Sequence, residues 1–191
     1  MQRYSRLKEV VLKKLQDELL PSFYYHSYHH TVDMHESAER IADYEKIDAS
    51  EKELLLVAAL FHDAGFIINQ ENHEQHSCKI AREMLPDFDY ELSEIDHICD
   101  LIMATCMPAN PQNHLQEIIC DADLDYLGRS DFKEIGDLLY KELFESGAVN
   151  GFDEWNQMQI RFLTNHRYFT SFGKTNREEK KQENLKVLLG E

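Results

Sequence analysis

The sequence predicts an all-helical bundle. Apolar residues recur at positions i, i+3, i+4 and i+7 along almost the whole chain, which is the spacing of one face of an α-helix. Only seven Gly and four Pro interrupt the 191 residues, so few breaks divide these periodic stretches. Residues 54–61 are apolar on all sides, which is typical of the buried central helix of a bundle.

The first elements follow from this periodicity and from helix start and stop signals. The first helix begins near the N-terminus and ends before Pro21, and an aromatic, histidine-rich stretch leads to a second helix over about residues 31–46. Ser50 and Glu53 form a capping-box pattern that is expected to begin the central helix.

The later elements are predicted in the same way. Asn72 is expected to cap a fourth helix that Pro86 ends, and Ser93 to cap a fifth that runs to about Cys106. A shorter helix is predicted over about residues 114–127. Three further helices are predicted over about residues 130–146, 153–169 and 175–189.

We expect residues 1–191 to form a single domain. The chain is 42% hydrophobic, which suffices for a sizeable core at this length. No internal repeat, low-complexity tract or linker divides the sequence. In the helix predicted over 153–169, Trp155, Met158, Phe162 and His166 share one face and are expected to pack in the core.

Composition and charge narrow the classes of function. With 20 Lys and Arg against 36 Asp and Glu, the formal charge of -16 repels polyanions, so a nucleic acid polymer is not an expected partner. No stretch approaches the roughly 18 apolar residues of a membrane span. The four cysteines form no C-x-x-C pair, which favours reduced thiols and a cytoplasmic protein. A homo-oligomer is compatible with this composition.

His62 and Asp63 stand at the end of the apolar central helix. Two ionisable groups are costly to bury there without partners. A divalent cation would compensate them, because imidazole and carboxylate suit Mn, Fe, Zn or Mg. A histidine at a helix C-terminus also interacts favourably with the helix dipole. The pair alone therefore leaves a metal site and a structural role open.

A second group of histidines precedes and begins the second helix. His26 and His30 are four residues apart, so a helical turn would place both on one face, and His30 continues the apolar stripe of Met34 toward the core. By the same spacing His29 and His35 point elsewhere and are expected to be solvated. A packed loop with hydrogen-bonded histidines is the alternative interpretation of this segment.

Three carboxylates, Asp121, Asp123 and Asp125, lie within five residues. Asp123 shares a helical stripe with Ile119 and Tyr126 and is therefore expected to face inward. Asp121 and Asp125 share a different face, on which acidic residues are usually solvated.

The order His30, His62 with Asp63, then Asp123 resembles the signature of the HD-domain metal-dependent phosphohydrolases, an all-helical superfamily of the phosphodiesterase-like type. Four segments carry the resemblance: YHSYHHTVD at 25–33, LFHDAGF at 60–66, NHEQHSCKIAREMLP at 72–86 and CDADLDYLG at 120–128. The resemblance covers about residues 24–131, which leaves 132–191 as a C-terminal helical extension.

The resemblance implies that one divalent ion, Mn, Fe, Zn or Mg, is held by four side chains, His30, His62, Asp63 and Asp123. It implies hydrolysis of a phosphoester bond in a small phosphorylated molecule, expected to be a nucleotide or cyclic nucleotide, by metal-activated water. Asp63 would also accept a proton from the attacking water. His26 would be the general acid that protonates the leaving group, and Asp33 could orient an imidazole.

Three further residues are candidates for contacts with the substrate phosphate, namely His73, Lys79 and Arg82. His73 could instead bind a second ion or simply cap its helix. Many relatives place another histidine where this chain has Cys106 and Met107, so one ion is expected rather than two. A di-iron oxygenase of the same fold is one alternative, and the missing histidine argues against it. A non-catalytic nucleotide-sensing domain is the other, and the complete signature argues against that.

Overall fold

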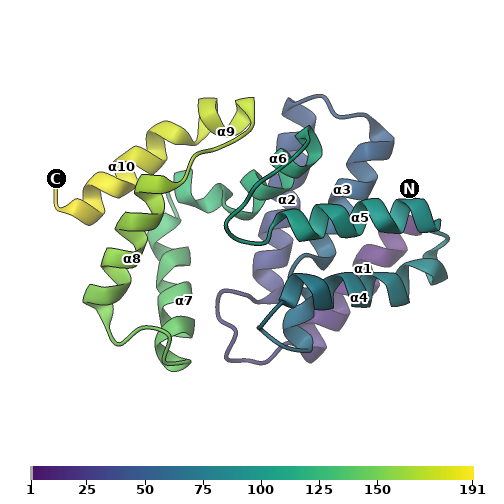
Figure 1. The fold of residues 1–191 in the computed structure, drawn as a ribbon, viewed down its shortest axis with the longest axis horizontal. Helices are drawn as coiled ribbons and strands as arrows, with labels where there is room; N and C mark the ends of the chain where they lie inside the picture. Colours follow the sequence, from purple (N-terminus) through teal and green to yellow (C-terminus); the bar gives the residue numbers. More distant parts are fainter. Residues whose placement is uncertain (1) are drawn as a thin grey trace.

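The computed structural model describes residues 2–191, which form ten α-helices and three short 3-10 helices without any strand (Figure 1). The predicted all-helical fold is thus confirmed. None of the helices in this part of the chain combines the length and the apolar character needed to cross a membrane.

The first part of the chain builds the larger bundle around the central helix. Its elements are α1 (Gln2–Glu18), α2 (Tyr28–Tyr44), α3 (Ala49–Phe61), η1 (Ala64–Ile67), α4 (His73–Met84), η2 (Leu85–Phe88) and α5 (Leu92–Ala104). Helix α3 packs against α1, α2 and α5. Every residue of 54–61 is buried, as the apolar run predicts.

The second part of the chain first packs against the bundle and then forms a separate group of helices beside it. Its elements are α6 (His114–Asp123), η3 (Asp125–Gly128), α7 (Phe132–Glu145), α8 (Phe152–Asn165), α9 (Ser171–Asn176) and α10 (Glu178–Leu189). Helix α6 packs on α2, whereas α7, α8 and α10 stand to one side (Figure 1). A smaller apolar cluster around Tyr126, Phe132 and Leu163 joins these last helices.

Two helix starts differ from the prediction. Asp48 caps α3, where it accepts hydrogen bonds from the N–H groups of Ser50 and Glu51, so the predicted Ser50 cap is wrong. An aspartate two residues earlier in extended conformation is an equally good cap, and Glu53 instead forms an ion pair with Arg3 at 2.8 Å.

The fifth helix shows the same kind of shift, whereas the fourth begins where it was predicted. Helix α5 is capped by Glu91, which forms a capping box with Glu94, and not by Ser93. Asn72 does precede α4 as predicted, but its backbone is left-handed and its side chain forms no cap hydrogen bond.

The three aspartates near the end of α6 are separated by a change of helix type. The α-helix ends at Asp123, and the 3-10 helix η3 begins at Asp125, so the helix predicted over 114–127 is two elements. The side chain of Asp125 is only 2% exposed. The expectation that it is solvated is therefore wrong.

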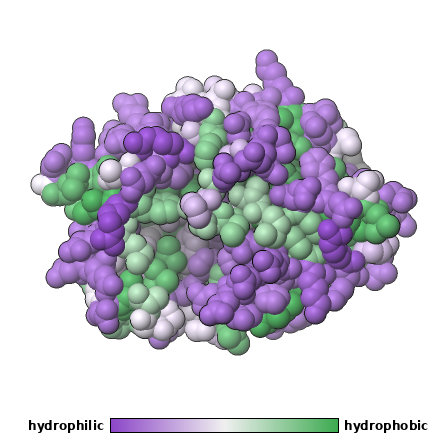
Figure 2. All heavy atoms as spheres, viewed as in Figure 1, coloured by the Kyte–Doolittle hydropathy of each residue, from purple (hydrophilic) through white to green (hydrophobic). Residues whose placement is uncertain are grey.

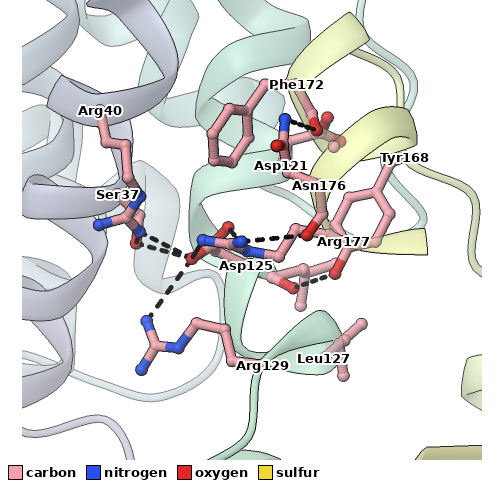
Figure 3. A network of polar contacts seen from close by, with 12 residues as sticks. Ser37, Arg40, Asp121, Asp125, Leu127, Arg129, Tyr168, Phe172, Asn176 and Arg177 are labelled. Atoms are coloured by element: carbon pink, nitrogen blue, oxygen red, sulfur yellow. Dashed lines mark hydrogen bonds and ion pairs between the residues drawn. The ribbon is translucent and has the colours of Figure 1, made fainter. Parts of the chain in front are cut away.

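Asp125 lies at the centre of a polar network between the bundle and the C-terminal helices (Figure 3). Its carboxylate accepts hydrogen bonds from Arg40 at 2.8 Å, Arg177 at 2.7 Å and Ser37 at 3.2 Å. The Arg129 guanidinium lies 3.6 Å away. Burial of this carboxylate is possible because several positive groups compensate its charge.

Asp121 is also buried, again contrary to the expectation. Its carboxylate accepts hydrogen bonds from the N–H of Phe169 at 2.9 Å, the N–H of Thr170 at 2.9 Å and the hydroxyl of Thr170 at 2.6 Å. Both flanking aspartates thus hold the segment before α10 against α6.

His35 differs from its expectation as well, since it is 2% exposed. Its ring contacts the hydroxyl of Tyr4 and lies 3.4 Å from Nζ of Lys8. Burial, with a smaller contribution from Lys8, lowers the pKa of His35 to about 4. Helix α1 covers this face of α2, and the spacing within α2 alone does not reveal that cover.

Candidate metal centre

Three helix ends bring the four predicted ligands together. His30 lies in the first turn of α2, and His62 is the C-terminal cap of the apolar helix α3, with Asp63 directly after it. Asp123 is the last residue of α6. Since α2 packs against both α3 and α6, these ends meet at one point of the bundle.

The distances within this cluster are short. His30 Nε2 lies 3.1 Å from Asp123 Oδ1 and 3.2 Å from His62 Nε2. Asp63 Oδ2 lies 3.2 Å from His62 Nε2 and 3.5 Å from His30 Nε2. The donor atoms of His30, His62 and Asp123 all lie within 4.8 Å of one another.

The donor set fits a divalent metal ion. Asp63 Oδ2 is enclosed, yet it accepts no hydrogen bond from any described residue, which is unusual for a buried carboxylate oxygen. His62 Nδ1 lies 2.9 Å from the carbonyl oxygen of Ala59. A proton on Nδ1 would be donated to that carbonyl, which leaves the lone pair of Nε2 facing the cluster. A cation between these atoms would satisfy all of them.

The electrostatics of the cluster favour positive charge. Burial alone would lower the pKa of His62, but the carboxylates of Asp63 and Asp123 outweigh it and raise this pKa to about 9. Burial would raise the pKa of Asp63, whereas His62 holds it well below its usual range. A metal ion that binds here therefore displaces a proton from the histidine.

His26 lies beside the cluster and is held by a residue that the sequence did not indicate. Its Nδ1 lies 2.5 Å from Oε1 of Glu142 in α7, which is 116 residues away in sequence. The other oxygen of Glu142 accepts the backbone N–H groups of Tyr25 and His26. The His26 ring also stacks on Phe66, with ring centroids 4.4 Å apart.

His26 lies near His30 for a different reason from the one predicted. Helix α2 begins at Tyr28, so His26 precedes it and no helical turn joins His26 to His30. Their rings are nevertheless 6.2 Å apart, because the chain before α2 is fixed by Glu142. His29 is exposed, as expected.

The structure brings one of the three candidate phosphate contacts to the site. His73, the first residue of α4, has Nε2 3.3 Å from Asp63 Oδ1. Lys79 is exposed, and Arg82 pairs with Asp96 at 2.6 Å. Arg82 is nine residues after His73, which places it on the opposite side of a helix with 3.6 residues per turn.

Asp33 does not contact an imidazole in this structure. Its carboxylate accepts hydrogen bonds from Arg129 at 2.7 and 2.9 Å and is partly exposed. Asp33 was expected to orient an imidazole. Among the described residues, Glu142 orients the ring of His26 and the Ala59 carbonyl orients that of His62.

A cavity of about 480 Å³ begins at the cluster. Its polar end is lined by His26, Asp63, His73, Glu74 and Asp123. From there it extends between the bundle and helices α7 and α8, and Figure 2 shows this face of the molecule hollowed beside those two helices. Cys106 and Met107, at the position of the missing histidine, also line it.

Comparison with known proteins agrees with this geometry. The family model described as the HD domain matches residues 27–125, which is more than half of the chain. A crystal structure of a predicted HD superfamily hydrolase from an uncultured Thermotogales bacterium shares the fold, with a TM-score of 0.64 and 18% identity over 97% of this chain and 89% of the other. No curated protein sequence matches the chain. The residues of the signature, their convergence and the match to the family model together show that the chain belongs to the HD domain family.

Proposed function

We propose that the protein is a metal-dependent hydrolase that cleaves a phosphoester bond in a small phosphorylated molecule, such as a nucleotide or cyclic nucleotide. The observation that carries the proposal is the convergence of two imidazoles and two carboxylates on one point at the end of a cavity, where Asp63 Oδ2 accepts no hydrogen bond from a described residue. The description of the Thermotogales structure as a predicted hydrolase agrees with it.

The proposed ligands are His30, His62, Asp63 and Asp123. An ion held by them would polarise a water molecule and offset the charge of the phosphoryl oxygens. Asp63 has a second oxygen, Oδ1, which lies 3.3 Å from His73 Nε2 at the cavity wall. This oxygen can accept a proton from the attacking water, and His73 can donate a hydrogen bond to a phosphoryl oxygen.

His26 is the proposed proton donor to the leaving oxygen. Glu142 binds Nδ1, so the proton to be transferred is on Nε2, which has no hydrogen-bond partner within residues 2–191. The ring lines the same cavity as Asp63 and Asp123. The hydrogen bond to Glu142 fixes the orientation of the ring.

The proposal is tested by a screen of phosphomonoesters and cyclic phosphodiesters against protein loaded separately with Mn, Mg, Fe and Zn. We expect release of phosphate or of a monoester with one of these metals. His26→Ala should lower kcat by about 10²- to 10⁴-fold while leaving metal content unchanged. His29→Ala, at an exposed position of the same segment, is the matched control.

Loss of the metal in His26→Ala would show that His26 is a ligand rather than the acid. Absence of bound metal in freshly purified protein, together with no hydrolysis after loading, would contradict the proposal as a whole.

A further inference from the structure

The part of the cavity between α7 and α8 differs in character from the metal end. We call it the α7–α8 chamber and define it by its lining residues Leu139, Leu143, Trp155, Gln159, Phe162 and Leu163. All but one of these side chains are apolar or aromatic. The chamber is continuous with the wall formed by Asp63 and Asp123, so it offers room for the leaving group of a molecule whose phosphate lies at the metal end.

The charges around the whole cavity restrict what can bind. Three carboxylates line it, those of Asp63, Glu74 and Asp123, whereas none of its lining residues is Lys or Arg. One divalent ion offsets only two of the three negative charges. A single phosphate can be compensated by that ion with His26 and His73, but a second anionic group on the ligand would lie in an apolar chamber without a cation.

Gln159 is the exception in the chamber wall. It is 9% exposed and lies among apolar side chains, yet its amide has no hydrogen-bond partner within the described residues. The facing residue in α7 is Gly136, where an added Cβ would lie 3.1 Å from Oε1 of Gln159. A side chain at this position would therefore press on the amide, and glycine leaves room for it.

The amide of Gln159 lines the cavity and is not fully enclosed, so its donor and acceptor are available to a molecule in the chamber. A ligand that offers an uncharged hydrogen-bonding group would therefore form a direct hydrogen bond with this amide. An apolar chamber with aromatic walls and a neutral amide is the usual form of a site for an uncharged aromatic or heteroaromatic group.

We propose that Gln159 determines specificity in the α7–α8 chamber, which takes the uncharged aromatic leaving group of a phosphate monoester through a hydrogen bond to a neutral polar substituent. The assignment of the chamber to a leaving group rests on the proposed function. The binding of the group itself does not, because none of the six residues that define the chamber is a proposed metal ligand.

Positive charge does occur in a neighbouring hollow of about 670 Å³, on the other side of Met158 and Phe162. Arg161 and Arg167 line that hollow. None of the proposed metal ligands lines that hollow, and neither arginine lines the chamber.

Trp155 allows binding to the chamber to be measured directly, because it is the single tryptophan of the chain and lines the chamber. Three benzyl alcohols that differ only at the para position serve as probes, with a carboxamide, a methyl or a carboxylate group. Each is titrated into metal-free protein, with Trp155 emission and calorimetry as the readouts. We expect the carboxamide to bind at least about ten-fold more tightly than the carboxylate, since a buried charge has no partner there.

The variant Gln159→Leu tests the residue itself. We expect it to shift the preference between carboxamide and methyl by about 3- to 10-fold toward methyl, which corresponds to one neutral hydrogen bond. Gln157→Leu, at an exposed position of the same helix, should leave the preference unchanged. Because the three probes are also compared in the wild-type protein, the charge argument is tested even if the variant folds poorly.

An unchanged preference in folded Gln159→Leu would overturn the proposal, as would equal binding of carboxamide and carboxylate or the absence of any Trp155 response. The phosphate monoesters of the same alcohols separate this result from the proposed function. If the alcohols bind as expected and no monoester is hydrolysed with any metal, the chamber assignment stands and the hydrolase proposal fails. If the monoesters are hydrolysed without regard to the para group or to Gln159, the hydrolase proposal stands and the chamber assignment fails.

Discussion

Replacement of Asp121 should destabilise the protein while leaving the four proposed metal ligands in place. In Asp121→Ala three donors lose their acceptor, the N–H groups of Phe169 and Thr170 and the hydroxyl of Thr170. Hydrogen bonds to a charged group contribute about 1.5–3 kcal/mol each. Burial raises the pKa of Asp121, so part of this gain is offset in the native protein by the cost of burying the carboxylate. We therefore expect a loss of about 3–5 kcal/mol.

For a protein of this size, each kcal/mol lowers Tm by about 2–4 °C, so Asp121→Ala should melt about 6–20 °C below the wild type. The comparison variant is Asp123→Ala, whose contacts are the imidazoles of His30 and His62. It should keep most of the stability of the metal-free protein but lose tight metal binding. Calorimetric melting of metal-free protein and elemental analysis of metal-loaded protein measure the two effects separately.

The reasoning would be refuted if Asp121→Ala melted within about 2 °C of the wild type. It would equally be refuted if folded Asp121→Ala lost its metal while Asp123→Ala retained it, since Asp121 would then be the ligand.

Three other predictions concern single groups. Glu142→Gln should lower kcat by about 10- to 100-fold at unchanged metal content, because the support of His26 loses its charge; unchanged steady-state kinetics would exclude a role for Glu142. The pKa of His35 is lowered to about 4 from an unfolded value of about 6.5, so the unfolded state binds a proton first as the pH falls. The contribution of His35 to stability is present above about pH 6.5, and about 3 kcal/mol of it should be lost between pH 6.5 and 4. In urea titrations, the free energy of unfolding of His35→Gln should depend less steeply on pH than that of the wild type. An equal dependence on pH in the two proteins would contradict this prediction. Addition of Mn or Zn at about 100 times Kd should stabilise the protein by about 2.7 kcal/mol, which thermal melting detects; His62→Ala should show no such shift, and a shift of equal size would place the ion elsewhere.

The fold class could be predicted because helical periodicity is a property of local sequence. The set of four ligands was predicted from the resemblance of the ordered motifs to the HD-domain signature, and local sequence supported two parts of it. The apolar run before His62 forces that residue and Asp63 to the inner end of α3, wherever the other helices lie. The choice of Asp123 over its neighbours relied on helical spacing within α6, and the structure does bring Asp123 to His30 and His62.

Residues whose surroundings come from distant segments could not be placed in this way. Glu142 supports His26 across 116 residues, and an acidic residue in an amphipathic helix carries no sign of such a partner. His35 and Asp125 were expected to be solvated because their own helices offer no cover, but α1 buries the one and the C-terminal segment buries the other. Helix caps were misplaced where two good capping residues stand within two positions of each other, as with Asp48 and Ser50.

The two carboxylates that flank Asp123 also set an order of events during synthesis of the chain. The ribosome adds Thr170 49 residues after Asp121, and Arg177 52 residues after Asp125. A nascent chain that has already released α1–α6 still lacks the Phe169 and Thr170 donors of Asp121, while Asp125 can contact Arg40 and Ser37 of α2 but not Arg177. The carboxylate of Asp121 must therefore stay hydrated until the segment before α10 emerges. Although all four proposed ligands lie within residues 30–123, tight binding of the ion is expected only after the segment that contains Phe169 and Thr170 has emerged and bound Asp121.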